Sequence, residues 1–144
     1  MRMALIGQSR CSVDPIELTR GGTSYAIDTV HAFKMRYPGV DFFFLIGADH
    51  VSQLPLWRDA ESLATHVEFV VIPRPGCPPA SLSKPYRITH LKGWPMAVSS
   101  SEIRDRIRRG LTIHHLVPDS VAEELSKSAL YPGDDIWGAR TPDR

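Results

Sequence analysis

A run of apolar residues that stops abruptly at a glycine and an acid constrains the fold of this chain more than any other feature. Residues Phe42 to Ile46 are all hydrophobic, and Gly47 and Asp49 follow at once. A continuous apolar run bounded by a glycine is typical of a parallel strand that is buried on both faces. Ligands of α/β proteins bind at the carboxyl ends of such strands. The segment therefore predicts an α/β fold with a ligand site at Gly47 and Asp49.

The hydrophobic pattern along the chain alternates between helical and strand periods. It predicts a helix turn over 2–6, a strand over 12–18, a helix capped by Thr23 or Ser24 that runs to residue 36, a strand over 41–46, a helical turn over 51–54, a helix over 59–65, strands over 67–72, 87–91 and 96–98, and helices over 99–109 and 118–128. This alternation is typical of a mostly parallel sheet with helices on both faces. Residues 1–131 are expected to form one domain, and 132–144, which lack apolar periodicity, a disordered tail.

Composition narrows the class of protein. The chain has 144 residues, of which 42% are hydrophobic and 23% charged, which is ordinary for one soluble globular domain. The net charge of +1 offers no basic surface for nucleic acid or an anionic membrane, and no apolar run reaches the length of a membrane span. Cys11 and Cys77 form no CxxC pair, so we expect reduced thiols in a cytoplasmic protein. The oligomeric state stays open, with a homo-oligomer among the options.

The residues after the apolar run suit one half of a nucleotide site. Gly47 would let a ligand approach the backbone, Asp49 would accept hydrogen bonds from sugar hydroxyls, and Trp57 would stack on a flat ring. The same residues also suit structural roles as a turn glycine, a helix cap and a core aromatic. Arg74, which lies between two prolines at the end of the next strand, would either face an anion at the same sheet edge or be solvated. The residues alone leave these alternatives open.

A second candidate site lies at the start of the helix predicted over 99–109. Three serines, Ser99, Ser100 and Ser101, stand where free backbone N–H groups and the helix dipole attract anions. Arg104 follows within the first turns, and a guanidinium matches phosphate oxygens in a bidentate manner. The alternative is a capping box formed by Ser99 and Glu102, worth about 1 kcal/mol of stability. The histidines and cysteines show no metal-ligand spacing, so no metal site is predicted.

Six segments, in this order along the chain, together resemble bacterial nicotinate-nucleotide adenylyltransferases. They are residues 21–29, 44–49, 54–57, 74–76, 98–104 and 116–121, and the similarity covers roughly 2–131. The resemblance implies a Rossmann-like nucleotidyltransferase fold. It also implies transfer of the adenylyl group of ATP, with Mg²⁺, to nicotinate mononucleotide, giving nicotinic acid adenine dinucleotide and pyrophosphate. In this family the mononucleotide phosphate attacks the α-phosphorus of ATP directly, so catalysis is mostly positioning and charge neutralisation.

The resemblance also implies roles for individual residues. Trp57 matches the tryptophan that stacks on the nicotinate ring, and Gly47 and Asp49 match residues that contact the adenosine. The residues that match the family's ATP-phosphate contacts are Ser100, Ser101 and Arg104, of which Arg104 is the catalytic candidate. The other candidates are Ser24, Tyr25, Ala26, Arg58 and Arg74 for the mononucleotide, and Ile46 for ATP.

The chain departs from the family pattern in two places. The GxFxPxHxGH-type loop, whose histidines face the ATP phosphates in the family, has no counterpart in these residues. We therefore expect the fold to lack its first strand-loop-helix segment, Leu45 and Ile46 to lie along an unpaired sheet edge, and the chain by itself to release little pyrophosphate. Ala26 stands where the family commonly has threonine, which leaves only its backbone N–H for the nicotinate carboxylate.

Two other functions remain compatible with the sequence. One is a non-catalytic remnant that binds the mononucleotide without ATP-dependent chemistry. The other is a related nucleotidyltransferase with another acceptor, such as phosphopantetheine or a cytidylyl acceptor. Trp57 and the segment of Ser24 and Tyr25 favour the pyridine mononucleotide over that second option.

Overall fold

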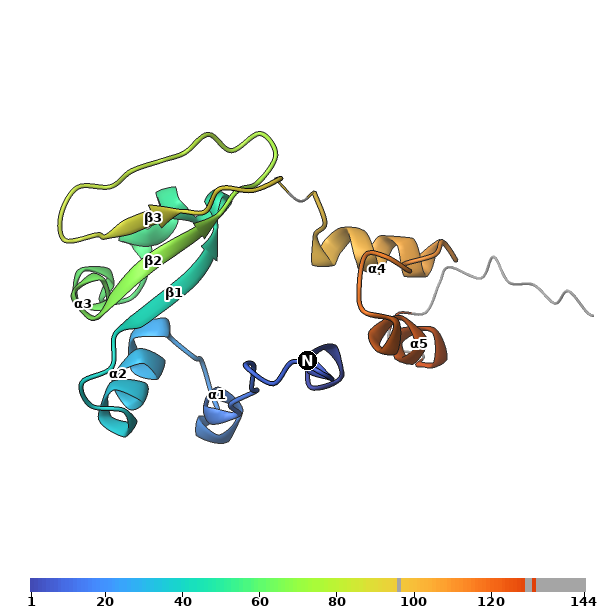
Figure 1. The fold of residues 1–144 in the computed structure, drawn as a ribbon, viewed down its shortest axis with the longest axis horizontal. Helices are drawn as coiled ribbons and strands as arrows, with labels where there is room; N and C mark the ends of the chain where they lie inside the picture. Colours follow the sequence, from blue (N-terminus) through green and yellow to red (C-terminus); the bar gives the residue numbers. More distant parts are fainter. Residues whose placement is uncertain (96, 129–130, 132–144) are drawn as a thin grey trace, which may run out of the picture. The chain divides into compact units, whose positions relative to one another are not determined.

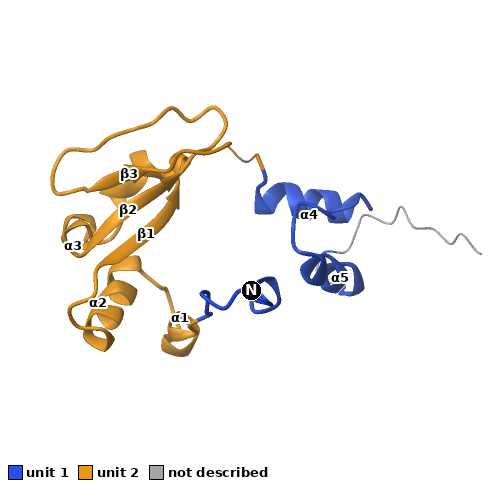
Figure 2. Cartoon of the chain, viewed as in Figure 1, with its two compact units in different colours: residues 1–13, 98–144 blue, residues 14–97 orange. Residues whose placement is uncertain are grey.

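A computed structural model describes residues 1–95, 97–128 and 131 of the chain (Figure 1). The chain divides into two compact units (Figure 2): unit 1 comprises residues 1–13 and 98–144, and unit 2 comprises residues 14–97. The single domain predicted over 1–131 stays a prediction, and the tail predicted over 132–144 lies outside the described residues. Within the described ranges, no helix has the length and apolar character needed to cross a membrane.

A parallel sheet forms the centre of unit 2. Its three strands, β1 (Phe42–Gly47), β2 (Val67–Ile72) and β3 (Ile88–His90), lie in the order β1-β2-β3. β1 and β2 pair in register along their whole length, and β3 pairs with residues 69–71 of β2. The parallel arrangement and these strands confirm the sequence-based prediction. β1 lies at an edge of the described sheet, as expected for Leu45 and Ile46.

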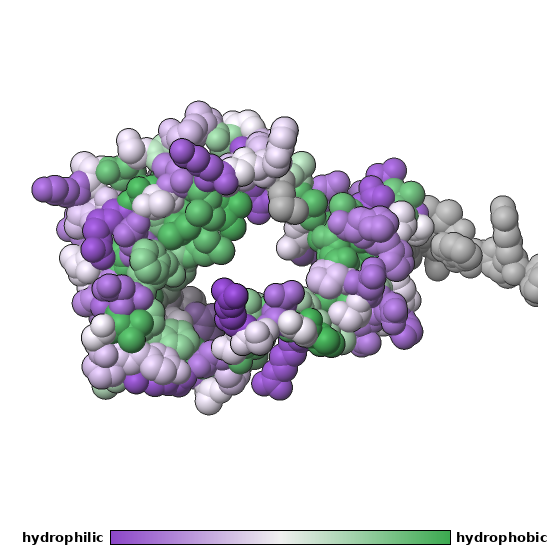
Figure 3. Space-filling model, in the orientation of Figure 1, coloured by the Kyte–Doolittle hydropathy of each residue, from purple (hydrophilic) through white to green (hydrophobic). Residues whose placement is uncertain are grey.

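One face of this sheet is buried under helical segments. These are α2 (Ala26–Arg36), the 3₁₀ helix η2 (Ala48–Leu56) and α3 (Ala60–His66). Their apolar side chains form one core with those of the strands: Ile27, Val30, Ile46, Val51, Leu54, Leu63, Ala64, Val67, Phe69 and Val71. On β1, Phe43 and Leu45 point away from this core and are 65% and 59% exposed. Hydrophobic surface is visible over the sheet of unit 2 in Figure 3.

The strand predicted over 12–18 is wrong. The structure has a short helix there, α1 (Ile16–Arg20), which follows residues without regular structure. The Asp14 side chain accepts a hydrogen bond from the backbone N–H of Ile16 at 3.0 Å, and Pro15 occupies the N-cap position. Gly21, at φ 71°, follows the last turn. These are helix start and stop signals, and they outweigh the apolar alternation that suggested a strand.

Two further predictions about element ends are corrected. Helix α2 has Tyr25 at its N-cap, with no side-chain hydrogen bond to the cap, so neither Thr23 nor Ser24 caps it. Residues 97 and 98 are not in a strand, and residue 96 lies outside the described residues. The other predicted helices and strands occur within a few residues of their expected bounds.

The described part of unit 1 contains three helical segments: the 3₁₀ turn η1 (Met3–Leu5), α4 (Ser100–Arg108) and α5 (Asp119–Lys127). The Ser99 side chain accepts a hydrogen bond from the backbone N–H of Glu102 at 3.1 Å, which confirms the predicted N-cap. The hydroxyl of Ser120 donates to the carbonyl of Met3 at 3.1 Å. The beginning of the chain is thereby joined to α5 within this unit.

The two phenylalanines on opposite sides of the sheet give a matched test of the core. Phe69 is fully buried and lies 6.0 Å from Phe44 and 6.3 Å from Tyr86 between ring centroids. Phe69→Ala should lower the free energy of unfolding by about 3–5 kcal/mol, because it leaves a cavity in a closed core. Phe43→Ala, on the exposed face, should change it by less than about 1 kcal/mol. Denaturant unfolding measures both, and equal losses would contradict the assigned core.

Candidate functional site

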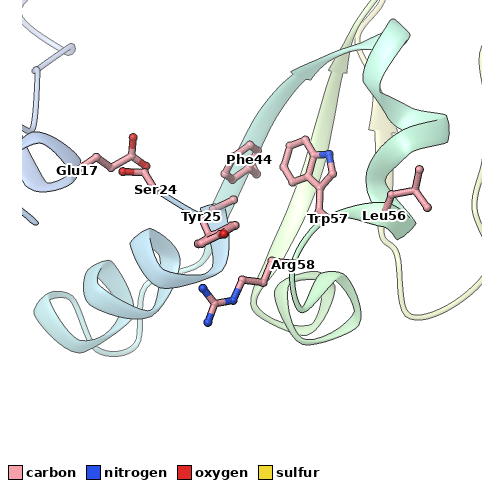
Figure 4. A pocket seen from close by; sticks show the side chains of 8 residues that line it. Glu17, Ser24, Tyr25, Phe44, Leu56, Trp57 and Arg58 are labelled. Carbon is pink, nitrogen blue, oxygen red and sulfur yellow. The ribbon is translucent and has the colours of Figure 1, made fainter. Parts of the chain in front are cut away.

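A pocket of about 450 Å³ opens in unit 2 beside the start of α2, a size typical of small-molecule sites. Eight residues line it: Glu17, Ser24, Tyr25, Ala26, Phe44, Leu56, Trp57 and Arg58. Figure 4 shows Glu17 and Ser24 at one end of the pocket and Leu56 and Trp57 at the other. All the candidates for the mononucleotide except Arg74 therefore meet here.

Two aromatic rings make the apolar side of the pocket. Phe44 and Trp57 meet edge to face, with ring centroids 5.8 Å apart and planes inclined by 73°. Phe44 comes from β1, where its ring also contacts the buried Phe69 of β2. The backbone N–H of Trp57 donates to the carbonyl of Leu54 at 3.0 Å, which fixes the end of η2. An indole held in this way gives a flat, preorganised surface on which another aromatic ring can stack.

The opposite side of the pocket is built around Tyr25. Its carbonyl accepts hydrogen bonds from the backbone N–H groups of Asp28 and Thr29 at 3.1 and 3.3 Å, so Tyr25 begins α2. The guanidinium carbon of Arg58 lies 4.4 Å from the centre of the Tyr25 ring, a cation–π contact. Arg58 also lies 3.8 Å from the carboxylate of Asp59. The tyrosine ring thus orients a positive charge at the pocket.

The start of α2 adds an electrostatic feature to the same pocket. Ala26 is the first residue of this 11-residue helix and lines the pocket. The first N–H groups of a helix have no acceptor within the helix, and the helix dipole gives that end a partial positive charge. A carboxylate bound beside Ala26 would be stabilised by both effects. The backbone therefore supplies an anion-binding end where the side chain is only a methyl group.

A second cluster of candidates lies where β1 ends. The Asp49 carboxylate is 3.7 Å from Arg74 Nε and 3.6 Å from His50 Nε2, and all three groups are partly exposed. Gly47 precedes this carboxylate in extended backbone, with φ −76° and ψ 151°. A Cβ at Gly47 would clash with the Asp49 carboxylate oxygen and approach Arg74 Nε to 3.4 Å. A Cβ at this position would therefore require the flexible Asp49 carboxylate to move, whereas the φ of Gly47 would suit any residue.

This cluster holds one residue that the sequence assigned elsewhere. Arg74 was expected on the mononucleotide side, but it does not line the pocket and instead faces Asp49, an ATP-side candidate. Ile46 is buried in the core beside the cluster. A contact between partly exposed charges is worth only a few tenths of a kcal/mol, so the pair contributes orientation more than stability.

The phosphate-side candidates lie on α4 in unit 1. Ser100 and Ser101 are exposed in its first turn, and the guanidinium of Arg104 donates to the hydroxyl of Ser101 at 3.2 Å. The serines and the arginine are therefore neighbours at one helix start, as the spacing predicted. Their convergence on one nucleotide with the residues of unit 2 stays a prediction.

Three residues that line the pocket were not among the candidates: Glu17, Phe44 and Leu56. Glu17 was not a candidate because residues 12–18 were predicted as a strand. Its position in the pocket follows only from the helix that starts after Asp14 and Pro15. Phe44 shares the face of β1 that carries Ile46, so its position follows from strand alternation once that face is known. Nothing in the sequence singles out Leu56 apart from its position before Trp57.

Comparison with known proteins shows the family to which this chain belongs. A family model described as cytidylyltransferase-like matches residues 1–106. The chain is 39% identical over 141 residues to a probable nicotinate-nucleotide adenylyltransferase of Geobacillus kaustophilus, covering 98% of this chain and 61% of that protein. A protein of the same name from Opitutus terrae is 37% identical over 133 residues, covering 91% of this chain and 68% of its own length. The chain belongs to the nicotinate-nucleotide adenylyltransferase family. It spans about 61–68% of the length of these curated relatives.

Solved structures with a similar fold support the fold assigned to this chain. Plasmodium falciparum nicotinic acid mononucleotide adenylyltransferase complexed with APC matches at a TM-score of 0.60 and 19% identity, over 77% of this chain and 60% of that one. A structure of it complexed with NaAD matches at a TM-score of 0.59. Together with the parallel sheet, these similarities confirm the predicted Rossmann-like nucleotidyltransferase fold.

The close approach of Asp49 to Gly47 can be tested on stability alone. Gly47→Ala should push the Asp49 carboxylate away from Arg74 and lower the free energy of unfolding by about 0.2–0.5 kcal/mol. In an Asp49→Ala background the clash is absent, so the same substitution should be neutral or stabilising by about 0.4–1 kcal/mol, since the backbone suits alanine. Chemical denaturation of the four proteins gives this cycle. An equal cost in both backgrounds would show that the acid is not what requires the glycine.

Proposed function

We propose that this chain serves the transfer of an adenylyl group from ATP to nicotinate mononucleotide, a step of NAD biosynthesis that yields nicotinic acid adenine dinucleotide and pyrophosphate. The observation that carries the proposal is the pocket of unit 2. It combines a fixed indole, a positive charge and the start of a helix in a member of the nicotinate-nucleotide adenylyltransferase family.

The mononucleotide fits the pocket group by group. Its pyridine ring would stack on Trp57, and its carboxylate would lie at the start of α2, beside the backbone N–H of Ala26 and near Ser24 and Tyr25. Arg58, held against the Tyr25 ring, would face its negatively charged phosphate. A neutral carboxamide would gain less from the helix end, so this arrangement favours the acid over the amide.

ATP would be held by the other two groups of candidates. Asp49, beside Gly47 and Ile46, would accept hydrogen bonds from the ribose hydroxyls. Ser100, Ser101 and Arg104, at the start of α4, would bind the phosphates. The described residues include no group of three or more side chains that could cage a metal ion. In this proposal magnesium arrives as part of the Mg-ATP substrate, because this ion keeps several water ligands and binds substrate phosphates.

In the proposed reaction, a phosphate oxygen of the mononucleotide attacks the α-phosphorus of ATP. A new P–O bond forms, the bond from the α-phosphorus to the bridging oxygen breaks, and pyrophosphate leaves with that electron pair. The chain would contribute positioning of the two nucleotides and, through Arg104, neutralisation of the charge on the phosphates. Cys11 and Cys77 are free thiols, which suits the cytoplasmic location that the sequence predicts.

Two tryptophans provide a matched test of the stacking. Trp57 lines the pocket, whereas Trp94 is 93% exposed. Trp57→Ala should weaken the binding of nicotinate mononucleotide about 10- to 100-fold, because aromatic stacking on a base contributes about 1–3 kcal/mol. Trp94→Ala should leave the affinity unchanged. Isothermal titration calorimetry measures both.

The titration of the unsubstituted chain decides the proposal itself. Saturable binding of nicotinate mononucleotide, tighter than that of nicotinamide mononucleotide, is the expected result. Absence of binding, or equal affinity of the Trp57→Ala variant, would contradict the proposed site. Pyrophosphate release on adding Mg-ATP then separates a chain that catalyses transfer from one that only binds the mononucleotide.

A further inference from the structure

We propose that Glu17 and Thr29 are positioning residues for this pocket. In this proposal, the hydrogen bond between their side chains fastens α1 to α2 and so fixes the turn over residues 21–25, which carries Ser24 and Tyr25 into the pocket wall. The choice of ligand rests on the proposed function. The conformational part does not, and it can be measured without a ligand.

Helix α1 needs an anchor outside itself. It has five residues, none of which is buried, and Leu18 is 85% exposed. A helix of this length is unstable alone in water, because forming its first turn costs more than its few hydrogen bonds return. Apolar burial contributes little here, so polar contacts with α2 must hold α1 in place.

The anchor is a single hydroxyl on α2. Thr29 Oγ1 donates a hydrogen bond to Glu17 Oε1 at 2.7 Å and accepts one from the Arg20 guanidinium at 3.3 Å. Glu17 and Arg20 are three residues apart on α1 and therefore project from the same face of the helix. A hydroxyl can donate one hydrogen bond and accept others, so both contacts are satisfied together.

The other end of α1 is fastened independently. Asp14 accepts hydrogen bonds from the backbone N–H of Ile16 at 3.0 Å and from Arg36, near the far end of α2, at 2.5 Å. The hydrogen bond with Asp14 raises the pKa of the Arg36 guanidinium above its ordinary value. With Asp14 holding the beginning of α1, loss of the Thr29 contacts should loosen the end of α1 that adjoins the pocket.

Thr29 links that end of α1 directly to the pocket wall. Its side chain holds α1, while its backbone N–H donates to the carbonyl of Tyr25 at 3.3 Å. The turn between α1 and Tyr25 contains Gly21 and Gly22, at φ 71° and 66°. Glycine adopts positive φ and many other backbone conformations at little cost, so this turn keeps one conformation only when both of its ends are fixed. Glu17 and Ser24 both line this end of the pocket (Figure 4).

Thr29→Val tests the proposal most cleanly, because Thr29 does not line the pocket and valine keeps its branched shape. We expect protection of the Gly21 and Asp28 amides against hydrogen exchange to fall about 10-fold, since both donate backbone hydrogen bonds at the ends of the turn. Affinity for nicotinate mononucleotide should fall about 5- to 10-fold. Thr19→Val, on α1, is the matched control and should change neither quantity.

Variants of Glu17 separate positioning from direct ligand contact. Glu17→Gln keeps an oxygen that accepts from Thr29 and should retain protection and affinity, whereas Glu17→Ala should lose both. In the double variant Glu17→Ala with Thr29→Val, the loss should be no larger than in Thr29→Val alone, which already removes both hydrogen bonds of the hydroxyl. Additive losses would instead show that Glu17 contacts the ligand, and would overturn the positioning role.

The two proposals fail in different ways. Undiminished amide protection in both Thr29→Val and Glu17→Ala would overturn the anchor, whatever the ligand. If the unsubstituted chain binds no mononucleotide, the proposed function fails, and the exchange measurement still decides whether the anchor exists. Lower protection with unchanged mononucleotide affinity would show that the anchor has no part in binding.

Discussion

In-register parallel pairing of β1 and β2 is the constraint on which the arrangement of unit 2 depends. Because Gly47 lies opposite Ile72, both strands end at the same edge, and the segments that follow bring Asp49 and Arg74 to within 3.7 Å. The same pairing places Phe44 on the buried face, where its ring packs between β2 and Trp57. β1 thus positions both the pocket and the contact between Asp49 and Arg74. A shift of one residue in the pairing register would move both sets of side chains to the wrong face of the sheet.

The pocket is an aromatic surface held in place by backbone hydrogen bonds. The backbone N–H of Trp57 donates to the carbonyl of Leu54 and its ring packs against Phe44, while Tyr25 begins the first turn of α2. Charge enters through Arg58 on the Tyr25 ring and through the helix end at Ala26. Such a site needs little reorganisation on binding, which reduces the cost of ordering a small ligand. Its weakest part is the turn after α1, whose helix buries none of its own residues.

Much of this fold could be read from the sequence because its strands are strongly apolar and its helices carry clear stop signals. Residues 67–72 were predicted as a strand with the observed bounds, and Ser99 as the cap of α4. The local pattern predicted the wrong element at 12–18. There a polar residue and a proline start a helix whose own residues show almost no hydrophobic periodicity. Glu17 was missed for that reason. The mononucleotide-side role of Arg74 stays a prediction, and its contact with Asp49 depends on strand pairing that no local pattern contains.

The central claim is that a pyridine mononucleotide binds between Trp57 and the start of α2, and nuclear magnetic resonance titration tests it most directly. Nicotinate mononucleotide added to the isotopically labelled chain should shift the Trp57 indole N–H and the backbone amides of residues 24–27, and leave the exposed Trp94 indole unchanged. Shifts confined to other parts of the chain, with the Trp57 indole unmoved at saturation, would contradict the account.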